Sequence, residues 1–159
     1  MLVLGVDPGS RVTGYGLVRK EGGGLTCMHS GIIAMSGQMP FYERIHRIYH
    51  SMIEIMNRHQ PEELAIEDVF FAKNVQSSLK IGHARGAVLI AAVDCGLRIF
   101  EYSPMEIKKA VAGYGSASKE QVRSMIRWML KLHNDPPLDA SDALATAICH
   151  LNWTRIKIA

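Results

Sequence analysis

The amino-acid sequence predicts an α/β fold, a mixed five-stranded sheet with helices packed on it. Three apolar segments, 2–7, 13–19 and 25–35, come first in the chain, and turns that contain glycine separate them. Two further apolar segments, 63–67 and 97–102, stand between long helical patterns. Hairpins followed by alternating helix and strand produce a sheet with antiparallel and parallel neighbours, which helices cover.

The first three strands are rich in Val, Ile, Leu and Thr, residues that favour extended structure. Asp7-Pro8-Gly9 separates the first strand from the second, and Gly22-Gly23-Gly24 separates the second from the third. Both tripeptides are typical of tight turns, so we expect consecutive hairpins. The first helix follows over 42–59, where apolar residues recur at helical spacing, and it ends before Pro61.

Two long helical patterns surround the fifth strand. The pattern over 74–94 stops at Gly96, which is a suitable C-cap. Pro104 follows Ser103 and suits the first turn of the next helix. We therefore expect the fifth strand to end directly before that helix.

The last part of the chain is predicted to be helical. Ser118 and Gln121 form a capping box before a helix over 122–132. The final helix follows Pro136-Pro137 and extends from about 139 to 153.

The composition is that of one globular domain over residues 1–159, with 48% apolar and 21% charged residues. The longest apolar run, 87–93, is far shorter than the roughly 20 residues of a membrane helix. We therefore expect a cytoplasmic protein with no membrane partner. Three widely spaced cysteines indicate reduced thiols rather than a disulfide framework or a zinc site. A net charge of +3 permits a polyanionic partner without requiring one.

Four carboxylates stand at the ends of predicted elements. Asp7 ends the first strand and Glu67 ends the fourth. Asp139 and Asp142 lie three residues apart at the start of the last helix, so they share a helix face. A carboxylate at the end of a buried strand is costly unless a partner balances it. If the fourth strand lies beside the first and the last helix packs on the sheet, the four acids meet at one sheet edge.

Each acid also has an ordinary structural role available. Asp7 suits the start of a turn and Glu67 a solvated strand end. Asp139 suits an N-cap, and Asp142 suits the first turn of a helix. Clustered carboxylates without His or Cys, however, suit Mg²⁺ or Mn²⁺ rather than zinc. Because two such ions can activate a water and stabilise a leaving oxygen, the joint placement favours phosphodiester hydrolysis.

Four motifs resemble those of the RuvC family of Holliday-junction resolvases, namely GVDPGSRVTGYG, AIEDVFFAKN, GYGSASKEQV and LDASDALATAICH. The resemblance extends over nearly the whole chain. It implies a ribonuclease-H-like fold and a homodimer that nicks two symmetric strands of a four-way DNA junction. It also implies work with the RuvA and RuvB branch-migration machinery in recombination and repair.

The resemblance assigns the four acids to a site for two Mg²⁺ ions, for which we expect Mn²⁺ to substitute. By similarity, Asp7 bridges both ions, Glu67 holds one, and Asp139 with Asp142 completes the other site. Some relatives carry histidine where this chain has Asp139. Lys119 matches a basic residue near the scissile phosphate, and its place at a helix start favours phosphate binding.

The resemblance also implies contacts with DNA. Phe70 corresponds to an aromatic residue that inserts among junction bases, and Phe71 beside it suits either stacking or a core position. Lys108 matches a second basic residue near the scissile phosphate, although a solvated role on an exposed face also fits it. Further expected backbone contacts are Arg11, Lys73, Lys80 and Arg85.

Other functions share parts of this pattern. Sugar kinases and actin-like ATPases also begin with a strand, an Asp-x-Gly turn and a hairpin, but they need a second lobe. A sister nuclease family would share Asp7 and cut other structured nucleic acids. A junction-binding protein without catalysis would not need four acids, which repel DNA. His46 and His50 have the spacing of a zinc helix, but no glutamate follows His46.

Overall fold

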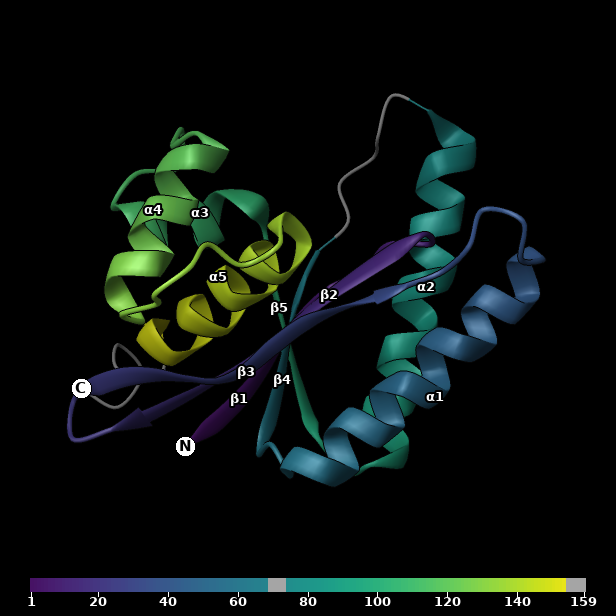
Figure 1. Ribbon diagram of the computed structural model, residues 1–159, viewed down its shortest axis with the longest axis horizontal. Helices are drawn as coiled ribbons and strands as arrows, with labels where there is room; N and C mark the ends of the chain where they lie inside the picture. Colours follow the sequence, from purple (N-terminus) through teal and green to yellow (C-terminus); the bar gives the residue numbers. More distant parts are fainter. Residues whose placement is uncertain (69–73, 154–159) are drawn as a thin grey trace.

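The computed structural model describes residues 1–68 and 74–153, and a five-stranded sheet forms its centre. The order across the sheet is β3-β2-β1-β4-β5, with β1 antiparallel to β2 and parallel to β4 (Figure 1). The predicted mixed sheet with two initial hairpins is therefore confirmed. The strands are β1 (Leu2–Asp7), β2 (Val12–Glu21), β3 (Gly24–Ala34), β4 (Glu63–Glu67) and β5 (Arg98–Tyr102).

Helices cover both faces of the sheet (Figure 1). On one face lie α1 (Phe41–His59) and α2 (Val75–Asp94), which contact each other. On the other face lie α3 (Pro104–Ala112), α4 (Lys119–Met129) and α5 (Leu138–Trp153), and α5 contacts β1 and β2 directly. No helix within residues 1–68 and 74–153 is long and apolar enough to cross a membrane.

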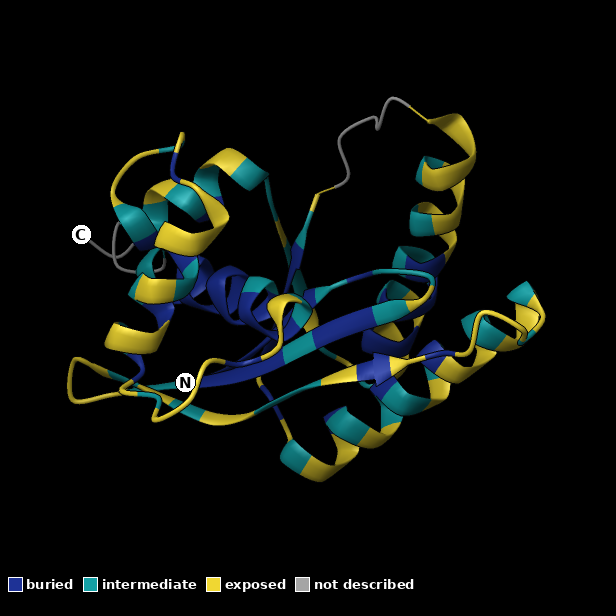
Figure 2. Ribbon diagram, turned by 45° about the horizontal axis from the view of Figure 1, so that its top comes forward, coloured by how far each residue is buried: buried dark blue, intermediate teal, exposed yellow. Residues whose placement is uncertain are grey.

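Side chains along the central strands alternate between two hydrophobic cores. On β1, Val6 is buried with residues of α1 and α2, whereas Val3 is buried with residues of α3, α4 and α5. By the same alternation, Asp7 lies on the face that α5 covers. Ala65 of β4 also belongs to the core beneath α5, so Glu67 lies on that face too. The most continuously buried elements are β1, β4 and α5 (Figure 2).

Two glycines allow α5 to lie very close to the sheet. A Cβ atom on Gly5 would lie 2.0 Å from the carbonyl oxygen of Ala143, and one on Gly16 would lie 2.6 Å from the side chain of Leu144. Gly5 and Gly16 stand opposite each other in the pairing of β1 with β2. Because neither carries a side chain, the backbone of α5 approaches to a distance that any other residue would prevent. This contact sets the depth of the helix that carries two of the four acids.

The helix ends follow the predicted capping residues, with small shifts. The capping box at Ser118 is present, but α4 spans Lys119–Met129 rather than 122–132. Its earlier start has a simple cause, because the residue after an N-cap is the first of the helix. Cys95 is the C-cap of α2, and Gly96 follows it with a φ of 71°, a left-handed conformation that suits glycine.

Candidate functional site

Asp7 and Glu67 end neighbouring parallel strands. Val6 pairs with Ile66 across β1 and β4, so the two acids follow at the same edge of the sheet. Alternation directs both toward the face that α5 covers. The fourth strand therefore lies beside the first, which is the arrangement that the predicted clustering of the acids requires.

Asp139 and Asp142 lie in the first two turns of α5. The N–H of Ser141 donates to the carbonyl oxygen of Pro137 at 2.8 Å, so the helix begins after Pro137. Asp139 is consequently inside the helix and is not its N-cap, contrary to the structural alternative considered above. Because α5 contacts β1, β2 and β4, its first turns bring both acids to the ends of β1 and β4.

The four carboxylates form one charge cluster. Burial raises the pKa of Asp7 to about 7, and repulsion from Asp142, Glu67 and Asp139 contributes to that rise. Burial also raises the pKa of Glu67, with repulsion from Asp142, and the pKa of Asp142, with repulsion from Asp139. Buried acids that repel one another favour a proton or a bound cation.

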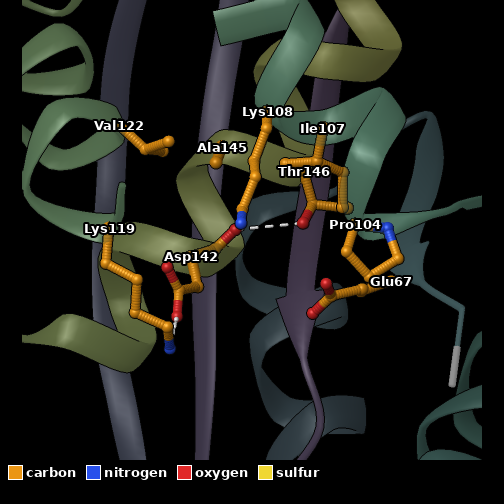
Figure 3. Close-up of a pocket in the computed structure, with 9 residues that line it drawn as sticks. All are labelled: Glu67, Pro104, Ile107, Lys108, Lys119, Val122, Asp142, Ala145 and Thr146. Atoms are coloured by element: carbon orange, nitrogen blue, oxygen red, sulfur yellow. Dashed lines mark hydrogen bonds and ion pairs between the residues drawn. The ribbon is translucent and has the colours of Figure 1, made fainter. Parts of the chain in front are cut away.

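Two lysines from neighbouring helices reach the acid cluster. Nζ of Lys119, at the start of α4, lies 3.5 Å from Oδ2 of Asp142, and this carboxylate raises the pKa of the lysine. The charge of Lys119, and to a smaller extent that of Lys108 on α3, opposes the rise in the pKa of Glu67 and of Asp142. Figure 3 shows both lysine side chains extending toward Asp142, with Glu67 across the pocket. Lys108 thus lines the pocket, whereas its neighbour Lys109 is exposed.

The remaining wall of this pocket was not predicted from the sequence. Thr146 stands one helical turn after Asp142, and its hydroxyl donates to the carbonyl oxygen of Asp142 at 3.0 Å. The i, i+4 spacing from Asp142 is the signal that locates Thr146 in the sequence. Apolar contacts come from α3, α4 and α5, through Pro104, Ile107, Val122 and Ala145. Apolar walls around carboxylates explain why burial is the main cause of their raised pKa values.

The donor set fits a hard divalent cation in its chemistry. Carboxylate oxygens are the ligands that Mg²⁺ and Mn²⁺ prefer, and their repulsion leaves charge for a cation to balance. Within residues 1–68 and 74–153, no three His, Cys, Asp or Glu side chains converge closely enough to hold one ion. The ammonium group of Lys119 instead acts as the counter-ion of the Asp142 carboxylate. Holding an ion therefore requires the acid side chains to turn toward a common point.

The expected DNA contacts fall into three groups. Phe70, Phe71 and Lys73 lie outside the described residues. Arg11, which follows β1, and Lys80 on α2 are both exposed. Arg85 differs from both, because its side chain is only 13% exposed and forms an ion pair with Glu101.

His46 and His50 form a pair on the exposed surface of α1. Their Nε2 atoms lie 2.8 Å apart, so one ring donates a hydrogen bond to the other. No third His, Cys, Asp or Glu joins them in the described part of the chain. Two ligands fall short of the closed coordination that a structural zinc site requires.

Comparison with known proteins identifies the family of this chain. Residues 3–150 match the family described as Crossover junction endodeoxyribonuclease RuvC. The protein of that name from Geobacter metallireducens is 46% identical over 157 residues, which cover 99% of this chain and 96% of the relative. The one from Marinobacter nauticus is 49% identical over 160 residues, with coverage of 99% and 91%.

Solved structures give the same result. Thermus thermophilus RuvC in complex with a Holliday junction substrate superposes with a TM-score of 0.94 at 38% identity, covering 99% of this chain and 96% of that chain. The yeast mitochondrial Holliday junction resolvase Ydc2 has a TM-score of 0.68 at 11% identity, covering 96% and 80%, and shares the fold alone. The expected ribonuclease-H-like fold class is confirmed, and the matches do not favour the kinase or ATPase alternative.

Proposed function

The chain belongs to the RuvC family of crossover junction endodeoxyribonucleases, and we propose that it cuts four-way (Holliday) DNA junctions at the cluster of Asp7, Glu67, Asp139 and Asp142. The reaction is hydrolysis of one phosphodiester bond in each of two symmetric strands. One observation carries the assignment of the site, namely the convergence of the ends of β1 and β4 with the start of α5, where burial and three neighbouring acids raise the pKa of Asp7 to about 7. A protein that needed only to bind DNA would gain nothing from this repulsion.

The four acids are proposed to hold two Mg²⁺ ions, with Mn²⁺ as a substitute. Such ions, when bound, activate a water and stabilise the leaving oxygen. Asp7 is suited to a shared position, because it interacts with each of the other three acids. Glu67 approaches from β4, whereas Asp139 and Asp142 approach from α5. With Asp7 on β1, the four acids thus approach the site from three elements.

The lysines are proposed to bind the scissile phosphate. Lys119 contacts Asp142 at 3.5 Å, and a cation held by Asp142 would compete for that carboxylate. Lys119 would then be available for the phosphate, at a helix start whose free N–H groups also favour an anion. Lys108, which lines the pocket from α3, adds positive charge beside Glu67. Phe70 is proposed to open the base stack near the cut.

The first experiment compares a mobile four-way junction with a linear duplex of matching sequence, with and without Mg²⁺. We expect paired nicks in the junction alone, only when Mg²⁺ or Mn²⁺ is present. Asp7→Asn should abolish cleavage and preserve junction binding. Asp94→Asn is the matched control, because this acid at the end of α2 accepts a hydrogen bond from Tyr49 and does not belong to the cluster. A wild-type protein that binds the junction but never cuts it would refute the nuclease assignment.

A homodimer is proposed because symmetric nicks require two active sites related by a two-fold axis. An apolar groove between α1 and α2 is the surface that we assign to the second copy. Val75, Leu79 and Ile90 line it and are 73%, 58% and 59% exposed. Contiguous apolar surface of this kind is uncommon on a monomer. The groove includes α2, whose sequence is apolar along much of its length, and we propose this helix as part of the interface.

Sedimentation velocity at micromolar concentration tests this interface. The double substitution Leu79→Glu and Ile90→Glu should produce a monomer that makes single, uncoordinated nicks. Trp128→Gln is the control, because this residue is 74% exposed on α4, across the sheet from the groove. A wild-type monomer that still makes paired nicks would argue against the dimer.

Three wider expectations rest on family membership. We propose that residues 1–159 act as a single nuclease domain, that the protein works in the cytoplasm where DNA junctions form, and that it cooperates with RuvA and RuvB. Stimulation of junction cleavage by added RuvA and RuvB is the direct test of that cooperation.

A further inference from the structure

We propose that Arg85 is a positioning residue that holds the backbone of Glu67, and that it is not a DNA contact. This inference depends on the proposed function, because it assigns a role to Arg85 through one of the four acids. From the sequence alone, Arg85 is expected instead to contact the DNA backbone, like Arg11, Lys73 and Lys80.

The guanidinium of Arg85 contacts three groups at the ends of β4 and β5. Nη2 lies 2.6 Å from Oε2 of Glu101 and 3.8 Å from Oδ1 of Asp68. Nε donates to the carbonyl oxygen of Glu67 at 3.4 Å. The side chain is 13% exposed, so most of its surface is in contact with protein. Nε and Nη2 therefore point toward acceptors at the ends of β4 and β5.

The contact reaches Glu67 from the face of the sheet opposite the active site. Arg85 comes from α2, which lies on the face away from α5. The carboxylate of Glu67 lies on the α5 side, in the pocket with Asp142. A guanidinium held on the far face therefore cannot reach the same phosphate as that carboxylate. It can, however, fix the peptide from which the carboxylate projects.

The end of β4 is held by a backbone hydrogen bond as well as by Arg85. The N–H of Asp68 donates to the carbonyl oxygen of Tyr102 at 2.8 Å, which continues the pairing of β4 with β5 by one residue. Arg85 joins the same two strands through Glu101 and the Glu67 carbonyl. Together these contacts tie α2, β4 and β5 at the residue that carries the acid. Loss of the tie would let Glu67 shift without removing its carboxylate.

Arginine suits this role better than lysine. Its planar guanidinium presents several donors in fixed directions, so one side chain can contact two carboxylates and a carbonyl at once. A lysine ammonium has no such fork and would satisfy fewer of these acceptors. Arg85→Lys therefore preserves the charge that DNA binding needs but loses the geometry that positioning needs.

The experiment measures single-turnover cleavage and junction affinity separately, in wild type, Arg85→Gln, Arg85→Lys and Glu101→Gln. A displaced catalytic group costs roughly 10- to 100-fold in rate, so we expect losses in this range for Arg85→Gln and Glu101→Gln, with junction Kd unchanged. The Mg²⁺ concentration for half-maximal cleavage should rise, because Glu67 would be misplaced as a ligand. The double variant Arg85→Gln/Glu101→Gln should cleave no more slowly than Arg85→Gln alone. Arg85→Lys should recover only part of the wild-type cleavage rate.

Lys80→Gln is the matched control, because Lys80 is exposed on the same helix and is an expected DNA contact. It should weaken junction binding and reduce its dependence on salt, with a normal rate at saturation. The positioning role is overturned if Arg85→Gln behaves like Lys80→Gln, or if Glu101→Gln cuts at the wild-type rate. Glu101 is 50% exposed, so its variant should fold even if Arg85→Gln does not. Wild-type cleavage in the same assay tests the proposed function independently.

Discussion

Gly14 lies against Asp139, and a Cβ atom on this glycine would stand 1.9 Å from the Asp139 carbonyl oxygen. Gly14 is also the residue paired with Asp7 across β1 and β2. The first turn of α5 thus rests on the strand residue beside Asp7, where no side chain separates them. The proximity of two acids that are far apart in the sequence depends on this missing side chain.

Gly14→Ala should therefore reduce both stability and cleavage. The added methyl group overlaps backbone atoms, so α5 must move away from β2, at a cost of about 1–3 kcal/mol. The movement separates Asp139 from Asp7, and junction cleavage should fall more than junction binding. Urea unfolding and single-turnover cleavage measure the two effects. Gly37→Ala is the control, since a Cβ there meets no atom within 4 Å; equal behaviour of the two variants would argue against the close contact.

The raised pKa of Asp7 predicts an unusual pH dependence of stability when chelator removes divalent ions. An unfolded aspartate loses its proton near its ordinary pKa of 3.8, whereas folded Asp7, with its pKa raised to about 7, keeps it until about pH 7. Between these values the folded state binds more protons, so the free energy of unfolding falls as pH rises. The decline is at most about 1.4 kcal/mol per pH unit for one group.

Asp7→Asn should remove most of this decline, because an amide does not ionise. The variant should be more stable than wild type at pH 8 in chelator. Millimolar Mg²⁺ should narrow this difference in the free energy of unfolding. Urea unfolding at pH 5 and pH 8 provides the measurement. Asp94→Asn should show the same dependence of the free energy of unfolding on pH as the wild type. An unchanged slope in Asp7→Asn would show that burial and repulsion do not act on this carboxyl as described.

Lys119→Gln should lower cleavage with little effect on stability. The side chain is 74% exposed, so its ion pair with Asp142 contributes little to folding. Loss of one positive group beside developing charge typically costs about 100-fold in rate. Single-turnover cleavage at saturating Mg²⁺ measures the effect. Lys109→Gln, an exposed lysine next to Lys108, should cut at the wild-type rate; similar losses in both variants would indicate a general effect of net charge.

Glu63→Gln should destabilise the fold strongly. Its carboxylate is 4% exposed, accepts a hydrogen bond from Nε2 of His150 and forms an ion pair with Arg98. Removing a carboxylate that accepts a buried hydrogen bond typically costs about 1–3 kcal/mol, because the buried ring of His150 loses its ionised acceptor. Urea unfolding near neutral pH measures the change. Glu54 is exposed on α1, so the free energy of unfolding of Glu54→Gln should stay within about 0.5 kcal/mol of the wild-type value. A similarly small change in Glu63→Gln would contradict the prediction.

Local patterns in the sequence were sufficient to predict the elements and their ends. The short apolar run in 63–67, the helical period in 42–59 and the capping box at Ser118 all depend on residues close together in the chain. The positions of Asp7 and Glu67 at strand ends follow from the same patterns, as does the one-turn separation of Asp139 from Asp142. Each of these signals is local, and the structure changed helix ends by only a few residues.

The relationships between distant residues depend on the tertiary structure. The sequence marks Gly14 as part of a hairpin, but only the packing of α5 on β2 shows that its missing side chain admits the Asp139 backbone. It marks Arg85 as a cation for DNA, but only the pairing of β4 with β5 places Glu101 and the Glu67 carbonyl within reach. Strand order and helix depth are set by the burial of many side chains at once. No short stretch of residues contains that information.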